Sequence, residues 1–299
     1  MVRYGLTMFP TDRSIDIVTL ARAAEERGFV SLYVPEHTHI PVSRRTSAPA
    51  GEPLAEEYKR SLDPFVALAA AAAVTEHLRV GTGIALVAQR DPIVMAKEIA
   101  SLDHLSGGRV TVGIGFGWNR EEMADHGVDY VRRREVVAEH VAAMQVLWGE
   151  EAVGFDGEFV SFEPSFAWPK PVQRPHPPIL LGGGGGPKLF EAIAAYGDGW
   201  LPIGGAGVRE ALPRLHAAVD AAGRDPAGLT VIPFGVLPDP GKMAYYEEIG
   251  FDEVVLRVPP APADVVLPLL DDYVGSSMEG HRVEGYNLIL RGVCRQCQA

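Results

Sequence analysis

The stretch ILLGGGGGPKLFEAIAA, residues 179–195, runs from an apolar segment through five glycines into a helix-like segment. This order predicts a β-strand, a glycine turn and the start of an α-helix. Glycine lacks a Cβ atom and tolerates positive φ, so consecutive backbone N–H groups can converge on an anion beside the positive end of the helix. We therefore expect a phosphate site here, with a flexible turn as the alternative. The residues of the expected site are Gly182, Gly183, Gly184, Gly185, Gly186 and Lys188.

The same alternation of strand and helix continues along the chain. The expected strands are residues 2–8, 29–34, 78–86, 109–115, 179–181, 199–203, 229–234 and 253–258. The expected helices are residues 15–27, 62–75, 92–105, 132–148, 188–196, 207–222, 242–249 and 263–273. Eight strands alternating with eight helices predict a (β/α)₈ barrel, or TIM barrel, formed by a single domain over residues 1–275. An open doubly wound sheet is the alternative, because alternation determines parallel strands and not closure.

Two segments interrupt the alternation. Residues 37–61 form a long polar loop after the second strand, and residues 150–178 form an insertion. The insertion begins with a hairpin pattern around Asp156 and Gly157, and a proline-rich connector follows it. Long loops in a compact domain are usually functional. We expect both segments to form walls of the substrate pocket.

Composition limits the classes of partner. The chain has 299 residues, 47% of them hydrophobic and 22% charged, as in ordinary globular domains. A net charge of −12 argues against a nucleic-acid or anionic membrane surface, because those partners bind clustered Lys and Arg. The N-terminus lacks the pattern of a signal peptide, and the richest apolar stretch, residues 65–74, is too short to span a bilayer. We expect a cytoplasmic protein with a small-molecule substrate.

The two cysteines, Cys294 and Cys297, lie close to the C-terminus. Two cysteines exclude a disulfide framework. Their C-x-x-C spacing is compatible with metal or redox chemistry, but a lone pair lacks the second ligand pair of a metal site. We therefore predict no metal, and residues 276–299 are left as a tail of unknown role.

Polar and aromatic residues follow the second and fourth expected strands. In a TIM barrel the active site lies at the carboxyl ends of the strands. Glu36 and His37 end the second strand, where His37 can relay a proton and Glu36 can orient it; the alternative is a loop histidine bonded to backbone. Trp118 and Asn119 follow the fourth strand and offer a stacking surface and an amide suited to a planar ring. A tryptophan that caps the core is the alternative for Trp118.

Four other residues are expected near the same rim, two on strands and two on a helix. Met8 and Thr82 belong to expected strands and point to the barrel mouth, with filling of the barrel as the alternative. Glu121 and Glu122 stand in the first turn of an expected helix, where a carboxylate stabilises the positive helix end. We assign both glutamates to capping before catalysis.

Five short motifs follow one another along the chain, and their order and spacing carry a family resemblance. They are Leu62–Leu68 (LDPFVAL), Gln89–Pro92 (QRDP), Leu105–Arg109 (LSGGR), Gly113–Glu122 (GIGFGWNREE) and Gly197–Asp198–Gly199–Trp200 (GDGW). Together with the glycine run they cover roughly residues 1–260. In this set the chain resembles the bacterial luciferase-like superfamily, and within it the F420-dependent oxidoreductase group of actinobacteria.

The resemblance implies a TIM barrel that holds coenzyme F420 or, alternatively, reduced FMN at its carboxyl rim, with the phosphate on the glycine run. It also implies a bulge with a non-proline cis peptide against the ring, near residues 85–88. The residues expected there are Ala85, Leu86, Val87 and Ala88. The acidic residue and histidine that end strand two in such enzymes match Glu36 and His37, and the family implies a homodimer.

The implied activity is hydride transfer between the deazaflavin ring and a small organic substrate, with His37 supplying or accepting the proton. One alternative is an FMNH₂-dependent monooxygenase that uses oxygen. Another is a non-catalytic carrier or sensor of F420 or flavin. Sugar-phosphate dehydrogenases of the family place a glutamate acid after strand four, where this chain has Trp118, so their substrate chemistry is not expected here.

Overall fold

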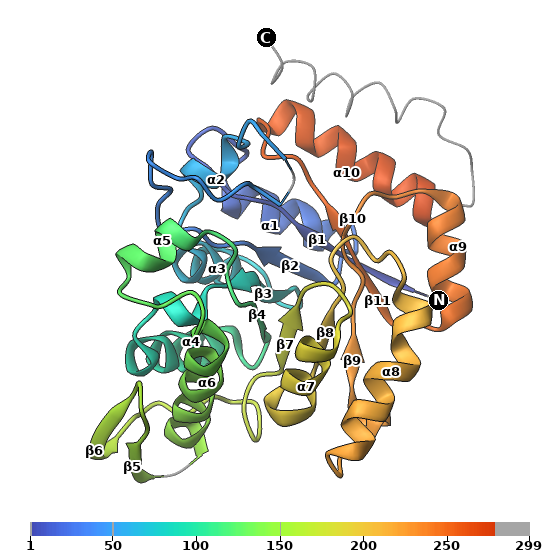
Figure 1. Ribbon diagram of the computed structural model, residues 1–299. Helices are drawn as coiled ribbons and strands as arrows, with labels where there is room; N and C mark the ends of the chain where they lie inside the picture. Colours follow the sequence, from blue (N-terminus) through green and yellow to red (C-terminus); the bar gives the residue numbers. More distant parts are fainter. Residues whose placement is uncertain (1, 50, 150, 279–299) are drawn as a thin grey trace.

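A parallel sheet forms the centre of the molecule (Figure 1). The structure is a computed structural model, and it describes residues 2–49, 51–149 and 151–278. The sheet order is β10-β11-β1-β2-β3-β4-β7-β8-β9. The strands are β1 (Arg3–Thr7), β2 (Ser31–Val34), β3 (Arg79–Ala85), β4 (Val110–Ile114), β7 (Ile179–Gly182), β8 (Gly199–Leu201), β9 (Thr230–Val231), β10 (Phe234–Val236) and β11 (Glu253–Arg257). All eight expected strands are therefore present, the seventh as two pieces.

The two ends of this sheet meet within one stretch of chain. β9 and β10 are separated by Ile232 and Pro233, and proline lacks the N–H that a continuous strand needs. The Ile232 backbone N donates to the Trp200 carbonyl at 3.0 Å, and the Val255 backbone N donates to the Pro233 carbonyl at 2.9 Å. Because residues 230–236 pair with β8 on one side and with β11 on the other, the sheet closes. The predicted (β/α)₈ barrel is confirmed, and the open sheet is excluded.

Helices surround the barrel (Figure 1). The long helices are α1 (Ile17–Glu26), α3 (Pro64–Ala73), α4 (Pro92–Ser106), α6 (Arg133–Gly149), α7 (Pro187–Tyr196), α8 (Val208–Ala221), α9 (Pro240–Ile249) and α10 (Ala263–Met278). The short ones are α2 (Glu57–Arg60) and α5 (Arg120–Asp125), with 3₁₀ turns η1 (Val87–Gln89) and η2 (Pro226–Gly228). α3 and α4 each begin with an aspartate cap followed by proline, a combination that satisfies the free N–H groups of a first turn.

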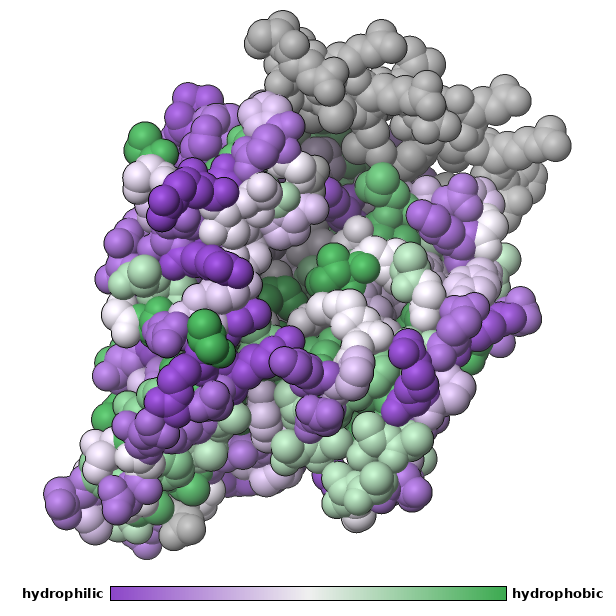
Figure 2. Space-filling model, in the orientation of Figure 1, coloured by the Kyte–Doolittle hydropathy of each residue, from purple (hydrophilic) through white to green (hydrophobic). Residues whose placement is uncertain are grey.

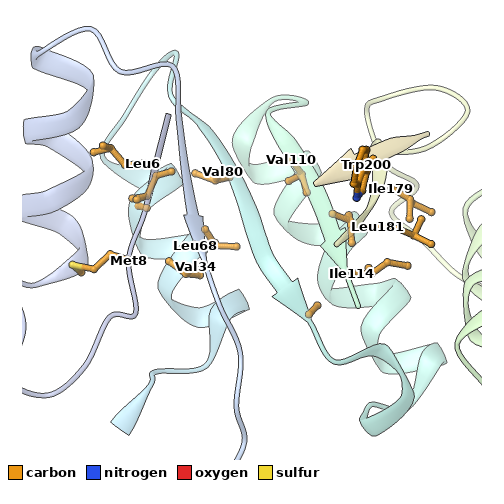
Figure 3. Packing of buried hydrophobic residues seen from close by; sticks show 14 of the residues in the cluster. Leu6, Met8, Val34, Leu68, Val80, Val110, Ile114, Ile179, Leu181 and Trp200 are labelled. Carbon is orange, nitrogen blue, oxygen red and sulfur yellow. The ribbon is translucent and has the colours of Figure 1, made fainter. Parts of the chain in front are cut away.

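Side chains alternate between two cores, as the period of two in a strand requires. Aliphatic residues such as Leu6, Val80 and Leu181 pack between the sheet and the helices (Figure 3). A second cluster contains Tyr33, Leu180, Leu201, Ile232, Phe234 and Val255. The rings of Tyr33 and Phe234 come from strands that are not neighbours and meet edge to face at 5.4 Å. This second cluster therefore fills the barrel interior and leaves the carboxyl ends of the strands for the site.

Outside the barrel, the 150–178 insertion and the C-terminal helix have the following structure. The expected hairpin is present as β5 (Ala152–Asp156) paired antiparallel with β6 (Ser161–Phe166). α10 continues to Met278, past the helix end expected at residue 273. The remaining tail, with Cys294 and Cys297, lies outside the described residues. Among residues that the structure describes, no helix has the length and apolar character needed to cross a membrane.

Candidate functional site

A pocket of about 500 Å³ opens at the carboxyl ends of the barrel strands. We call it the central pocket, and Figure 2 shows a hollow near the middle of that face with hydrophobic residues beside it. Its lining includes these residues predicted from the sequence: Met8, Glu36, His37, Leu86, Trp118, Gly182 and Gly183. The loop of residues 37–61 contributes Pro49 and Tyr58. The insertion contributes no lining residue among its described positions, so the expectation that it forms a pocket wall is wrong.

The floor of the pocket is made by glycines and one isoleucine. A Cβ atom on Gly115 would lie 2.4 Å from Ile84 Cγ2, and a Cβ on Gly182 would lie 2.0 Å from Ile84 Cδ1. The two missing side chains therefore make room for the Ile84 side chain. Ile84 has φ of 105°, which is a strained conformation for a β-branched residue. The β3–β4 register shifts between Gly83 and Ala85 at the same place.

The bulge implied by the family resemblance is therefore present, but its form differs from the expectation. The cis peptide bonds of the described residues all precede prolines, as at Glu52–Pro53. The expected non-proline cis bond at residues 85–88 is absent there, and the bulge lies at Ile84 with positive φ. The physical reason is that Gly115 and Gly182 accommodate the displaced side chain without a change in the peptide bond.

His37 lies between a buried carboxylate and an indole. Its Nδ1 is 2.8 Å from Glu122 Oε2, and Trp118 Nε1 donates to His37 Nε2 at 3.3 Å. The indole N–H can only donate, so Nε2 is an acceptor and Nδ1 carries the proton that it donates to Glu122. His37 and Trp118 both line the central pocket, so the Nε2 atom and the indole N–H that it accepts from belong to the pocket wall. The arrangement is the geometry of a general base whose orientation is held by a carboxylate.

The carboxylate beside His37 is not the one that the sequence suggested. Glu36 Oε1 accepts from Arg90 Nε at 2.6 Å, and Glu36 Oε2 accepts from the Leu86 backbone N at 2.8 Å. Glu36 thus ties the end of β2 to the chain that follows β3. The prediction that Glu36 orients His37 is corrected, because both of its oxygens are used by these partners.

Glu122 takes that position instead. Its side chain is fully buried, and its Oε1 atom has no partner among the described residues. The capping role assigned to it belongs to Asn119, whose Oδ1 accepts from the Glu122 backbone N at 3.4 Å. Asn119 is 1% exposed and does not line the pocket, so the structure does not bring its amide to the expected ring site.

Glu121 holds the long loop rather than the helix end. It accepts from Thr46 Oγ1 at 2.7 Å and from the Arg45 backbone N at 3.1 Å. The hydrogen bond from Thr46 lowers the pKa of Glu121 to about 2. The loop of residues 37–61 is therefore fastened to α5, on which the partner of His37 stands.

Tyr58 is a pocket residue that sequence reasoning missed. Its ring lies 5.2 Å from that of His37, 6.0 Å from that of Trp118 and 5.0 Å from that of Phe9. Burial raises the pKa of Tyr58. The available signal was a single aromatic residue in a polar loop, and nothing local indicates that the loop returns to the barrel mouth.

The glycine run meets two arginines. Gly182 and Gly183 line the pocket, whereas Gly184, Gly185, Gly186 and Lys188 lie beyond its lining toward α7. Arg133 and Arg134 at the start of α6 line the same side, and Arg134 Nη1 donates to the Lys188 carbonyl at 3.3 Å. Burial and the neighbouring Arg133 lower the pKa of Arg134. The run Arg132–Arg134 was visible in the sequence, but its approach to the glycines was not.

The remaining expected contacts face elsewhere. Thr82 Oγ1 donates to the Gly113 carbonyl at 2.7 Å. Successive residues of a strand face opposite sides, and in β3 the next residue, Gly83, is the one that lines the pocket. Ala85, Val87 and Ala88 are buried in the main core and do not line the pocket. Of the segment 85–88, only Leu86 reaches the pocket. No group of metal-ligating side chains occurs within the described part of the chain.

The chain is similar in sequence to known proteins. A family model described as luciferase-like monooxygenase matches residues 9–237. An uncharacterized protein of Mycobacterium tuberculosis (strain H37Rv) is 47% identical over 268 residues, which cover 88% of this chain and 94% of that protein. The F420-dependent hydroxymycolic acid dehydrogenase of the same organism is 29% identical over 226 residues, which cover 74% of this chain and 57% of that protein.

A solved structure shares the fold. The F420-dependent secondary alcohol dehydrogenase in complex with an F420-acetone adduct superimposes with a TM-score of 0.73 at 18% identity. The match covers 93% of this chain and 99% of the other. Fold, family model and sequence relatives agree, and the chain belongs to the luciferase-like monooxygenase family.

Proposed function

We propose that this protein is a coenzyme F420-dependent oxidoreductase that transfers hydride between the deazaflavin ring and a small organic substrate. The observation that carries the proposal is His37, a lining residue of the central pocket whose Nε2 accepts from Trp118 and whose Nδ1 is held by buried Glu122. A base in this position serves a reaction in which a proton leaves or joins a substrate oxygen. The name of the hydroxymycolic acid dehydrogenase relative supports F420 as the cofactor.

The residues of the pocket fit a phosphorylated, ring-containing cofactor. The Arg133 Nε atom is buried and lacks a hydrogen-bond partner among the described residues, and the same is true of Thr7 Oγ1 on β1. Both residues line the central pocket. Arg133, Arg134 and Gly183 would hold the phosphate, since guanidinium groups and a glycine turn both favour anions. Ile84, Leu86 and Met8 would support the ring. When bound, the deazaflavin supplies hydride acceptance or donation at its central ring carbon.

The protein's own part in the reaction is to hold and move one proton. In the oxidation direction, a substrate hydroxyl would replace the Trp118 N–H as donor to His37 Nε2 and pass its proton there. The carbon that bears the hydroxyl gives up a hydride, so the substrate loses two electrons and two hydrogens and becomes a carbonyl compound. Glu122 holds the imidazole in the required tautomer and stabilises the imidazolium that forms.

The rival function keeps the pocket and uses FMNH₂ with oxygen to oxygenate a substrate, as the description of the matching family model suggests. Separate titrations with F420 and FMN, followed by cofactor fluorescence, distinguish the two functions. We expect F420 to bind at least about tenfold more tightly, a difference of about 1.4 kcal/mol. Clearly tighter binding of FMN, with oxygen consumption, would favour the monooxygenase.

A carrier or sensor without catalysis is the remaining rival. Replacing His37 by Ala tests it, because removal of a general base lowers turnover by about 100-fold or more. We expect the F420 dissociation constant to change by less than about twofold in the same variant. Tight F420 binding with no cofactor turnover across a panel of alcohols and carbonyl compounds would support a carrier.

We also propose that the protein forms a homodimer through α3 and α4. Val66 on α3 is 72% exposed, and Ile93 and Val94 on α4 are 44% and 55% exposed. These aliphatic side chains lie on helices that pack against each other. Sedimentation analysis at micromolar concentration is expected to give a dimer, and Val66→Asp is expected to give a monomer. A wild-type monomer would contradict this assembly.

A further inference from the structure

One side of the central pocket is walled by rings around His37 Nε2. The ring centroids of Tyr58 and Trp118 lie 5.2 and 5.6 Å from that of His37. Phe9 continues the wall beside Tyr58 at 5.0 Å. Val258 and Pro260 line the pocket after β11, the strand next to β1. We call the space bounded by Phe9, Tyr58, Trp118, Val258 and Pro260 the aromatic compartment.

The charged groups around this compartment already have partners. Glu36 is used by Arg90 and by the Leu86 backbone N. Arg257 lines the pocket near its mouth, where its side chain is 53% exposed and its Nη2 lies 3.4 Å from Glu57 Oε1. His37 Nε2 therefore becomes available to a ligand that replaces the Trp118 N–H, and the charged neighbours Glu36 and Arg257 each have a partner of opposite charge.

Arg44 extends this neutral surface behind the rings. It lies over Trp118 at 5.6 Å, and its guanidinium forms two hydrogen bonds with Glu52, at 2.8 and 3.0 Å. It is not part of the pocket lining. Its charge is therefore directed to Glu52, and it supports the outer face of the indole.

The groups that would bind an anion lie across the barrel. β7, which leads into Gly182 and Gly183, is four strands from β1 in the closed order β1-β2-β3-β4-β7. Arg133 and Arg134 stand on that side, and the Arg133 Nε atom has no partner in the described part of the chain. An anionic group is therefore directed to the β7 side and an apolar group to the β1 and β11 side, where Phe9, Val258 and Pro260 lie, and Trp118, which follows β4, stands between the two sides.

We propose that the aromatic compartment binds the apolar part of an uncharged alcohol or ketone, and that it selects against phosphorylated sugars and polyols. This inference rests on the proposed function, because it names the substrate class of the same site. One hydroxyl or carbonyl oxygen reaches His37 Nε2. Hydroxyls of a polyol that lie against Phe9, Val258, Pro260 or the ring faces would lose water without gaining a partner, and each such loss lowers affinity by about tenfold or more.

The test uses the F420-loaded protein and binding as its first readout. Cyclohexanone, 1,2,3-trihydroxypropane and glucose 6-phosphate are titrated while the fluorescence of tryptophan is recorded, and Trp118→Phe identifies the signal of Trp118. We expect cyclohexanone to bind at least about tenfold more tightly than the other two. Equal or tighter binding of glucose 6-phosphate would overturn the proposal.

Variants of Tyr58 make the test specific. Tyr58→Ala is expected to weaken cyclohexanone binding by about tenfold, because it removes an aromatic wall of the compartment. Tyr58→Phe keeps the ring and is expected to stay within about twofold of wild type, which separates lost packing from a disturbed loop. Tyr245→Ala, on α9 and outside the pocket lining, is the matched control. Unchanged cyclohexanone affinity in Tyr58→Ala would also overturn the proposal.

Oxidation of the reduced cofactor separates this inference from the function on which it rests. Cyclohexanone reduction takes a hydride at the carbonyl carbon from reduced F420 and a proton at the oxygen from Nε2 of the His37 imidazolium, which gives cyclohexanol and oxidised F420. The neutral His37 that remains takes up the proton that is released when reduced F420 is oxidised, so the step balances. Tight, Tyr58-dependent cyclohexanone binding without reduction would support the compartment and contradict the function. Reduced-F420 turnover with polar carbonyl substrates alone would support the function and contradict the compartment.

Discussion

At the scale of single residues, two buried glutamates have distinct tasks because their partners differ. Glu36 is paired with Arg90, which also contacts Asp63 and Glu98. Glu122 has no arginine partner within the described residues and instead accepts a hydrogen bond from His37 Nδ1. A carboxylate paired with an arginine is neutralised by a permanent charge. A carboxylate paired with a histidine lies next to a group that can gain or lose a proton.

Replacing each glutamate by glutamine separates the two tasks. Glu122→Gln is expected to lower kcat by about 10- to 100-fold, since the amide no longer stabilises the imidazolium, while KM and F420 affinity stay near wild type. Glu36→Gln is expected to lower the free energy of unfolding by about 1–3 kcal/mol through Arg90. Steady-state kinetics and urea unfolding provide the readouts.

Glu121→Gln is the control for these variants, since Glu121 binds the loop and does not contact His37. We expect its kcat to stay within about threefold of wild type, a difference below about 1 kcal/mol. A Glu122→Gln enzyme with wild-type kcat would remove the positioning role of Glu122.

His140 predicts a pH dependence of stability. It is 7% exposed, its Nδ1 lies 3.1 Å from the Val87 carbonyl, and burial lowers its pKa. The unfolded chain then takes up a proton at higher pH than the folded chain, so stability from this site is present above about pH 6.5 and is lost as pH falls.

Urea unfolding at pH 7 and pH 5 tests this linkage. The stability advantage of wild type over His140→Leu is expected to be larger at pH 7 than at pH 5. His216→Leu, on the exposed side of α8, is the control and is expected to show no such change. An advantage of wild type that grows toward pH 5 would contradict the assignment.

At the scale of elements, barrel closure depends on close backbone contact between β8 and β9. A Cβ atom on Gly199 would lie 1.9 Å from the Thr230 carbonyl oxygen and 2.8 Å from Leu180 Cδ2. The carbonyl is part of the strand and cannot yield without loss of pairing. Gly199→Ala is therefore expected to destabilise the protein by about 3 kcal/mol, at the upper end for an overpacked site.

Gly149→Ala is the matched control for this substitution. A Cβ atom on Gly149, at the end of α6, would meet nothing within 4 Å. We expect a change of about 1 kcal/mol or less, in the stabilising direction, because alanine favours a helix. Equal urea midpoints for the two variants would contradict the role of the β8–β9 contact in closure.

The start of α6 predicts a phosphate-dependent affinity. Arg133 and Arg134 repel each other, and an anion between them relieves this repulsion. Arg134→Leu is expected to weaken FMN binding by about tenfold, since hydrogen bonds to charged groups are worth about 1.5–3 kcal/mol. Riboflavin, which lacks the phosphate, is expected to bind the variant and wild type within about twofold.

Arg209→Leu is the control, because Arg209 lies on α8 and pairs with Glu248 outside the pocket. Fluorescence titrations at two salt concentrations provide the measurement. Equal weakening of FMN and riboflavin would show that Arg134 supports the fold of the pocket and does not recognise phosphate.

At the scale of the whole molecule, we expect binding of the proposed cofactor to stabilise the barrel. The central pocket is lined by residues from β1, β2, β3, β4, β7, β8, β10 and β11 or from the segments that follow them, so unfolding destroys it. F420 at about 100 times its dissociation constant is expected to add about 2.7 kcal/mol. This corresponds to a rise in Tm of about 5–10 °C.

Thermal unfolding with and without F420 measures the effect, and riboflavin at the same multiple of its own dissociation constant is the reference. A rise in Tm that increases in step with the fraction of protein bound to F420 would support a single site within the barrel. An unchanged Tm at a saturating F420 concentration would place the cofactor outside this pocket.

The alternation of apolar strands and helices predicted a parallel α/β fold, with a barrel favoured over an open sheet, and the glycines at 182–186 led us to expect a phosphate-binding turn after the fifth strand. These signals are local in the chain, because side-chain period and glycine backbone freedom depend on neighbouring residues. The order of the strands then placed His37, Trp118 and the glycine run on one rim. The sequence alone was sufficient for this much.

The tertiary structure alone decided which side chains meet at that rim. Glu122 pairs with His37 across 85 positions of sequence, while adjacent Glu36 turns away to Arg90. Tyr58 returns from the long loop, and the arginines of α6 approach the glycine run. Such pairings depend on barrel closure and on the burial of charge, which are properties of the packed chain and not of any short segment.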